Sequence, residues 1–186
     1  MMRLKVYSAP AIEPVTVAQV KLSAHISHAI EDTLIDAWIK SGRELAEGYQ
    51  RRAYISLKID LSLDSWPCDP FFVPRSPLQT VTHIKYYDTD GTEYTVSAAD
   101  YYVDTAGEPG RIGLTYGTTW PTTSLRPING ISVRFIAGYG LTAATVPQNV
   151  IDAILLYCTF RNENRAGEIQ EIPASFYGLL RHDRIY

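Results

Sequence analysis

The spacing of apolar residues changes twice along the chain. Ile30, Leu34, Trp38, Leu45 and Tyr49 recur at spacings of four or, once, seven residues, which predicts one apolar helix face across residues 29–51. Ile35, Ile39 and Ala46 widen this apolar stripe. The next stretch, "YISLKIDLSL" at residues 54–63, alternates strictly between apolar and polar residues and predicts a strand with one solvent-exposed face. A helical period returns after Pro147. The chain is therefore helical towards both ends and β-rich between them.

This order predicts an α+β fold, in which a small helical bundle from the N- and C-terminal segments carries an inserted antiparallel β region. We expect the N-terminal helices of the bundle in residues 1–52, the β-rich insert in 53–140, and the C-terminal helices and tail in 141–186. The length of 186 residues, with 46% hydrophobic and 20% charged residues, is typical of a folded chain that buries a core of ordinary size.

Local signals set the expected element ends. Thr16 with Gln19 forms a capping box for a short helix over residues 17–24, and Thr145 with Gln148 forms a second one. Asp90-Gly91 predicts a hairpin turn. Gly42, in the middle of the long helix, would allow close contact with another helix. The last helix is expected over residues 173–180, after a stop at Gly167.

Composition excludes some classes of function. The net charge is −3 and the pI about 5.8, so there is no basic excess to hold nucleic acid through its phosphates. Two distant cysteines, Cys68 and Cys158, do not demand a disulfide and favour a reducing compartment. No apolar run is long enough for a signal peptide or a membrane span. We therefore expect a soluble protein made in the cytoplasm, with no membrane partner.

The turn Gly138-Tyr139-Gly140 lies between a strand and a helix, where phosphate-binding loops occur. A P-loop needs a lysine, and none follows Lys85. A dinucleotide fingerprint needs a third glycine, where this chain has Ala143. We interpret Gly138 and Gly140 as a hinge between the β region and the bundle, and expect no cofactor.

The spacing of residues gives little support for a metal site or a catalytic site. His25, His28 and Glu31 would share a face on one continuous helix, but His25 is expected in the preceding turn, so no metal site is predicted. The nucleophile-elbow motif G-x-S-x-G does not occur. We predict no catalytic residues and no enzymatic activity.

The remaining class of function is binding to other proteins. Thirteen tyrosines suit either strands or protein interfaces. Arginines and glutamates mix late in the chain, which is typical either of a solvated helix face or of a salt-bridged subunit contact. The tail 181–186 is either frayed or docked into a partner.

Five ordered pieces of the chain resemble the head–tail connector proteins of tailed phages, also called adaptor or head-completion proteins. They are "EPVTVAQVKLSAHI", "DTLIDAWIKSGRELAEGYQRRAYI", "VPRSPLQTV", "DYYVD" with "PGRI", and "FIAGYGLTAATVPQNVIDAILLYCTFRNENR". Together they cover residues 13 to 181. Two features depart from the family pattern. An alanine is commoner before the arginine than the glycine of Gly42-Arg43, and the segment 65–77 differs in its length and proline content.

The resemblance implies a structural virion or prophage protein at the head–tail junction. Such proteins assemble as a ring, usually a dodecamer, beneath the portal, where they extend the DNA channel and offer a surface to a head-closure or tail protein. Family members insert C-terminal segments into the portal, so the candidate docking tail is Arg181, His182, Arg184, Ile185 and Tyr186. The candidate subunit interface is Lys40, Arg43, Glu44, Glu47, Arg161 and Arg165.

Because DNA must slide during packaging and ejection, we expect a channel wall of mixed or negative charge, through which duplex DNA passes without sequence readout. The sequence leaves two other hypotheses about function open. One is a small β-rich ligand- or protein-binding module, and the other is a hydrolase whose site is not recognised in the sequence.

Overall fold

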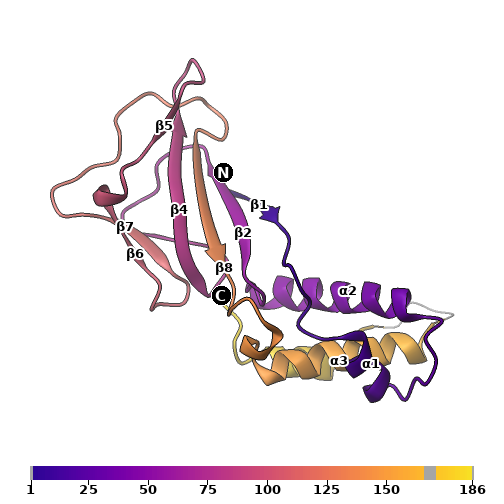
Figure 1. Cartoon of the computed structure of the whole chain (residues 1–186). Helices are drawn as coiled ribbons and strands as arrows, with labels where there is room; N and C mark the ends of the chain where they lie inside the picture. The colour runs from indigo at the N-terminus through magenta and orange to yellow at the C-terminus, as the bar shows by residue number, and fades with distance from the viewer. Residues whose placement is uncertain (1, 166–170, 186) are drawn as a thin grey trace. The chain divides into compact units, whose positions relative to one another are not determined.

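The computed structural model describes residues 2–165 and 171–185. It divides into two compact units, one formed by Met1–Ala9 with Ser56–Gly138 and one by Pro10–Ile55 with Tyr139–Tyr186. We call them the β unit and the helical unit (Figure 1). The helical unit joins segments from both ends of the chain, and the β unit contains antiparallel sheets. The predicted α+β class, a helical bundle with an inserted antiparallel region, is confirmed.

The β unit contains two sheets. The larger has the strand order β1-β2-β8-β4-β5, and the smaller has the order β3-β7-β6 (Figure 1). The strands are β1 Met2–Ser8, β2 Leu57–Leu63, β3 Phe71–Phe72, β4 Leu78–Tyr87, β5 Glu93–Thr95, β6 Tyr101–Asp104, β7 Arg111–Leu114 and β8 Ile131–Ala137.

The predicted alternation is observed in β2, where the leucines and isoleucine are buried and the polar residues between them are not. Leu61 lies in register with Val133 of β8, and both are fully buried. Between the sheets, Trp66 stacks on Trp120 with ring centroids 4.7 Å apart, and the pair also contacts Tyr86 of β4 and Phe71 of β3. This aromatic cluster joins the two sheets.

The hairpin turn at Asp90-Gly91 is present between β4 and β5, with Gly91 at φ +84°. Strand β1 was not among the expected elements. It pairs antiparallel with β2, Leu4 opposite Leu61, and all its residues are exposed. The sequence alternates there, but over too few residues to stand out from an irregular terminus.

The helical unit contains α1 Val17–Ser23, α2 Asp32–Gln50, α3 Gln148–Glu163 and α4 Ala174–Leu180. The capping box of α1 is confirmed, because Thr16 Oγ1 accepts from the Gln19 N–H and the Gln19 side chain accepts from the Thr16 N–H. The core includes Ile35 and Ile39 of α2, Ile154 of α3 and Phe176 of α4. Helices α2 and α3 run side by side (Figure 1).

Two expectations about these helices are wrong. Helix α2 begins at Asp32, so Ile30 precedes it and is exposed, and Leu34 is exposed too. The buried side follows Ile35, Trp38, Ile39, Gly42 and Ala46. The part of the expected stripe formed by Trp38, Ile35, Ile39 and Ala46 is therefore buried, and its first two members, Ile30 and Leu34, are not.

The second capping box does not form. Thr145 lies in a 3₁₀ turn, Ala143–Thr145, and its hydroxyl donates to the Thr142 carbonyl oxygen. Pro147 caps α3, and the Gln148 side chain donates to Asp152 instead. The expected stop at Gly167 lies outside the described residues.

Candidate interaction surfaces

The C-terminal residues dock onto the helical unit of their own chain. The main-chain N–H of Ile185 donates to the Gln50 carbonyl oxygen at 3.1 Å, which links the tail to the end of α2. The buried Gln50 side chain donates in turn to the Leu180 carbonyl oxygen at 2.7 Å. The tail is therefore an ordered part of the subunit as far as Ile185.

The predicted docking residues divide into two kinds. Arg181 and His182 are exposed. Arg184 and Ile185 are half-buried, and the Arg184 guanidinium lies 4.6 Å from the centre of the Tyr49 ring. Tyr186 lies outside the described residues. In this segment, Arg181 and His182 are therefore the candidates best placed to reach a partner.

A hollow of about 370 Å³ lies beside the tail. Its lining is made of arginine, tyrosine and small residues: Tyr49, Ala174, Tyr177, Gly178, Arg181 and Arg184. Tyr49 and Tyr177 contact each other with ring centroids 5.0 Å apart. Arginine and tyrosine are the residue types that most often anchor protein interfaces, and the arginines favour an acidic partner.

Arg43 and Glu47 do not lie on the exposed side of α2. They are 6% and 8% exposed. Arg43 pairs with Glu13 at 2.7 Å and with Glu47 at 2.9 Å, and the Tyr54 main-chain N–H donates to Glu47. Burial by itself would lower the pKa of Arg43, but the two carboxylates outweigh it and the pKa is raised.

The expectation that Arg43 and Glu47 meet a neighbouring subunit is therefore corrected: both are used inside the subunit. The physical reason is that the buried side of α2 extends beyond the apolar stripe to Arg43 and Glu47, which lie next to the entering segment that carries Glu13.

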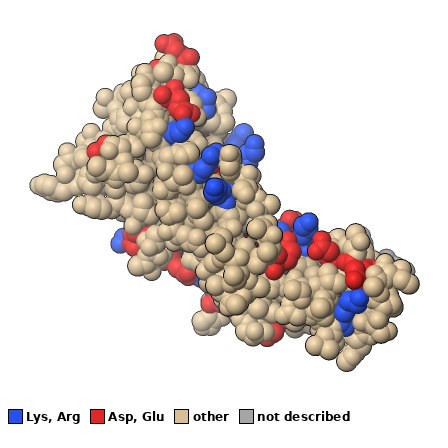
Figure 2. Space-filling view, in the orientation of Figure 1, with Lys and Arg blue, Asp and Glu red and all other residues tan. Residues whose placement is uncertain are grey.

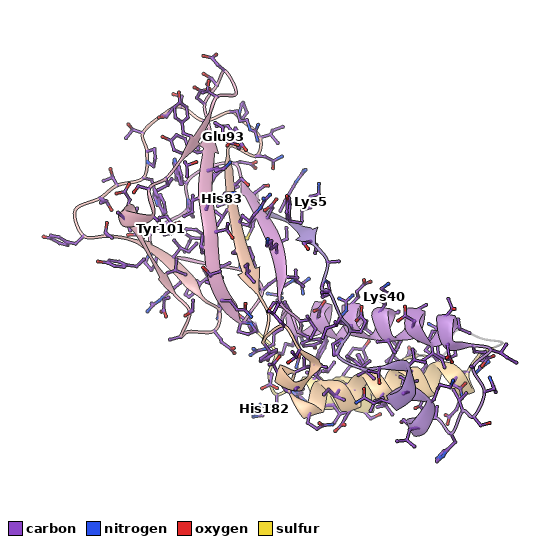
Figure 3. The ribbon with its side chains drawn as sticks, in the orientation of Figure 1. Lys5, Lys40, His83, Glu93, Tyr101 and His182 are labelled. Atoms are coloured by element: carbon purple, nitrogen blue, oxygen red, sulfur yellow. The ribbon has the colours of Figure 1, made fainter. Side chains whose placement is uncertain are left out.

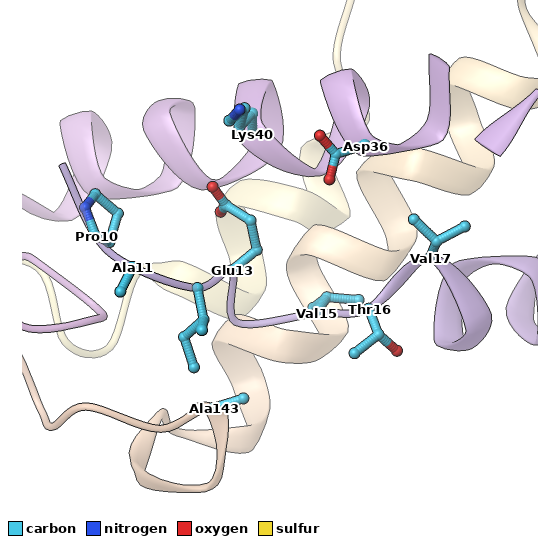
Figure 4. Close-up of a pocket in the computed structure, with 10 residues that line it drawn as sticks. Pro10, Ala11, Glu13, Val15, Thr16, Val17, Asp36, Lys40 and Ala143 are labelled. Atoms are coloured by element: carbon cyan, nitrogen blue, oxygen red, sulfur yellow. The ribbon is translucent and has the colours of Figure 1, made fainter. Parts of the chain in front are cut away.

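The exposed side of α2 carries Asp36, Lys40 and Glu44 at four-residue spacing. Asp36 and Lys40 border a groove of about 510 Å³. Figure 4 shows the groove between α2 and the extended segment before α1, and its lining comprises Pro10, Ala11, Ile12, Glu13, Val15, Thr16, Val17, Asp36, Lys40 and Ala143. Two of the predicted interface residues, Lys40 and Glu44, are thus accessible on this side.

The predicted interface arginines near the end of α3 differ in their surroundings. Arg161 is exposed and reaches the Tyr157 hydroxyl at 3.3 Å. Arg165 makes a two-point ion pair with Glu31 at the start of α2 and lies 5.4 Å from the Trp38 ring. The hydrogen bond from Arg165 holds the pKa of Glu31 below its usual value. Arg165 therefore already ties the two long helices together.

The histidines considered as metal ligands lie near one another without forming a site. His25 falls in the turn after α1 with φ +55°, and His28 Nε2 lies 3.9 Å from Glu31. Within residues 2–165 and 171–185, no group of three histidine, cysteine or carboxylate side chains is arranged to hold a metal ion. In the same part of the chain, no helix combines the length and apolarity needed to cross a bilayer.

The two glycines of the expected hinge meet different constraints. Gly138 ends the β unit with φ +137°, a conformation that favours glycine, and its N–H donates to the Pro77 carbonyl oxygen. Gly140 lies in the helical unit, where a Cβ would come within 2.7 Å of Thr145. Glycine is thus required at both positions for local reasons.

The fold is similar to that of chains in several solved structures. No protein-family model matches the chain, and no curated protein matches it. Among solved structures, a chain in the neck of an empty gene transfer agent (GTA) particle, computed with C6 symmetry, is similar with a TM-score of 0.82 and 23% identity over 99% of this chain and 96% of that one.

A chain in the virion of the native GTA particle is similar with a TM-score of 0.82 and 21% identity, covering 98% of this chain and 95% of that one. A chain in the neck of the native particle, computed with C12 symmetry, has a TM-score of 0.75 and 22% identity, covering 98% and 96%. The likeness runs over essentially the whole of each chain, so both units belong to one shared fold.

Proposed function

We propose that this chain is a non-catalytic structural protein of the head–tail neck of a phage-like particle, where its copies form a ring beneath the portal. The observation that carries the proposal is the fold shared with neck and virion chains of GTA particles over 98% or more of this chain. A match of that extent includes both units, whereas a common small domain would account for only one. The symmetric neck structures also favour a ring as the form of assembly.

The exposed candidates for contact between helical units are Lys40, Glu44 and Arg161. Side chains of both signs on one surface suit a head-to-tail contact, in which each copy meets the next through a different side. Arg165 supports such a contact indirectly, since it fixes the start of α2 to the end of α3.

The docked tail and its hollow form the proposed portal-binding surface. Arg181 and His182 supply exposed polar side chains, and the tyrosines of the hollow supply apolar area. The opposite end of the ring would receive a head-closure or tail protein. Duplex DNA would pass along the axis without sequence readout, in keeping with the net charge of −3.

Substitution at the tail tests the portal contact. Arg181→Glu with His182→Glu should abolish co-sedimentation with the cognate portal and leave the melting temperature unchanged, because both side chains are exposed. Lys58→Glu, an exposed charge reversal in the β unit, is the matched control and should bind the portal as the wild type does. Unchanged portal binding by the double variant would show that Arg181 and His182 do not contact the portal.

A further inference from the structure

Strand β1 leaves part of the β unit uncovered. It is the end strand of the larger sheet, so its outer backbone edge has no partner strand among the described residues. Met2, Leu4 and Val6 are 51%, 42% and 55% exposed, although their register partners on β2 are all buried. The apolar layer of the sheet therefore continues onto β1 and is open there.

The other face of β1 is cationic. Arg3, Lys5 and Tyr7 alternate with the apolar residues. Lys5 lies opposite Asp60, but Asp60 is held by a two-point ion pair with Arg134, and Lys5 makes no ion pair within the described residues. Figure 3 labels Lys5 on β1, and Figure 2 shows lysine and arginine side chains gathered over this part of the β unit. Here β1, which we call the edge surface, combines a free backbone edge, aliphatic side chains and positive charge.

The outward face of the smaller sheet has the opposite chemistry. Phe72 and Tyr102 are 58% and 69% exposed. Asp104 pairs with Arg111 at 2.8 Å, and Asp69 lies beside Gly113 while accepting from the Leu114 N–H. Asp104 and Arg111 balance each other, so the exposed Asp69 supplies the excess negative charge of this aromatic surface, which we call the sheet surface.

The two surfaces fit each other better than either fits itself. Exposed apolar patches on a folded chain mark contact sites, and opposite charge sets the choice of partner. Two cationic edge surfaces would repel, and so would two acidic sheet surfaces, so a two-fold dimer through either one is disfavoured. A closed ring requires two different surfaces on every copy, each facing a neighbour.

We propose that the edge surface of one copy docks onto the sheet surface of the next, so that the β units supply a head-to-tail contact of the ring. This inference rests on the proposed function, which it extends by naming the surfaces and the partner, a second copy of the chain. Aliphatic residues of β1 would pack on Phe72 and Tyr102, and Lys5 would face Asp69.

Disulfide trapping tests the pairing directly. The background is Cys68→Ser, because Cys68 is exposed, whereas Cys158 is buried with its pKa raised to about 12 by that burial and stays unreactive. Val6→Cys protein and Tyr102→Cys protein are mixed and oxidised. We expect the mixed dimer to exceed each self-linked dimer at least tenfold. Equal yields of the three products, or none, would overturn the proposal.

A second pair of variants tests assembly without cross-linking. Leu4→Glu with Lys5→Glu disables the edge surface, and Phe72→Lys with Tyr102→Lys disables the sheet surface. On the portal, each variant alone should fail to complete a ring, and their mixture should add pairs of subunits, since one intact edge surface then meets one intact sheet surface. If either variant alone builds rings like the wild type, the contact is wrong.

The outcomes separate this inference from the proposed function. Wild-type rings without the mixed cross-link would overturn only the β-unit contact. Absence of any ring of wild-type protein on the portal would remove the proposed function. Salt-sensitive binding of a DNA duplex that Lys5→Glu abolishes, without a mixed cross-link, would assign the cationic face to nucleic acid and also overturn the proposal.

Discussion

Arg52 donates a hydrogen bond from its Nε to the main-chain carbonyl oxygen of Asp183 over 2.6 Å. The same guanidinium reaches the Tyr139 hydroxyl at 3.0 Å. The Arg52 side chain thus joins three segments of the helical unit: the end of α2, the segment that begins at Tyr139, and the C-terminal tail. The tail is therefore part of the fold, and truncating it would confound any test of portal binding with a loss of stability.

Arg52→Ala should lower the free energy of unfolding by about 2–3 kcal/mol, because a charged donor and the acceptors it served are lost from a largely buried site. Urea denaturation measures this value. The control, His182→Ala, lies in the same segment but is exposed and should change stability by less than about 0.5 kcal/mol. Equal stability of the two variants would contradict the assigned role of Arg52.

Gly42→Ala should destabilise the protein by about 1–3 kcal/mol, because the new Cβ would meet Tyr157 Cδ1 at 2.8 Å in the contact between α2 and α3. Gly48→Ala is the matched control on the same helix. Nothing lies within 4 Å of its added Cβ, so helix propensity should raise stability by about 0.5–1 kcal/mol. Changes of the same sign in both variants would show that the close approach at Gly42 is wrong.

Arg43→Met should cost about 3–5 kcal/mol, since Glu13 and Glu47 would lose their shared cation in a buried place. Adding Glu13→Gln to Arg43→Met should recover part of that loss by removing one stranded charge. A thermodynamic cycle built from the single and double variants measures this coupling. Additive effects would indicate that Arg43 and Glu13 do not interact in solution.

His83 should make stability depend on pH. Burial first, and then the charges of Lys85 and Arg134, lower the pKa of His83 below 6.5. As pH falls through 6.5, the unfolded chain takes up this proton before the folded chain does, so acid reduces stability, and the loss levels off below the folded pKa. His83→Gln should flatten the stability curve between neutral pH and about pH 5. An unchanged slope in this variant would contradict the environment described for His83.

The sequence predicted the parts of the fold whose signals are local. Strict alternation identified β2, and the Thr16–Gln19 pair identified the start of α1, because each depends on residues that are neighbours along the chain. The fold class followed from the order of these segments.

What the sequence did not show depends on contacts between distant residues. Arg43 looked like a solvent-facing residue of α2, and only the return of Glu13 beside it explains its burial. The tail likewise docks through main-chain groups, such as the Leu180 carbonyl oxygen and the Ile185 N–H, which leave no pattern in residue types. The exposed strand β1 has no buried positions to mark it.

The proposed function requires that copies of this chain assemble around an axis against a portal. Electron microscopy of the purified protein mixed with its cognate portal tests it most directly. We expect an additional ring, coaxial with the portal, whose subunits show the two-unit fold described above. Portal particles that carry no added density at saturating protein would contradict it.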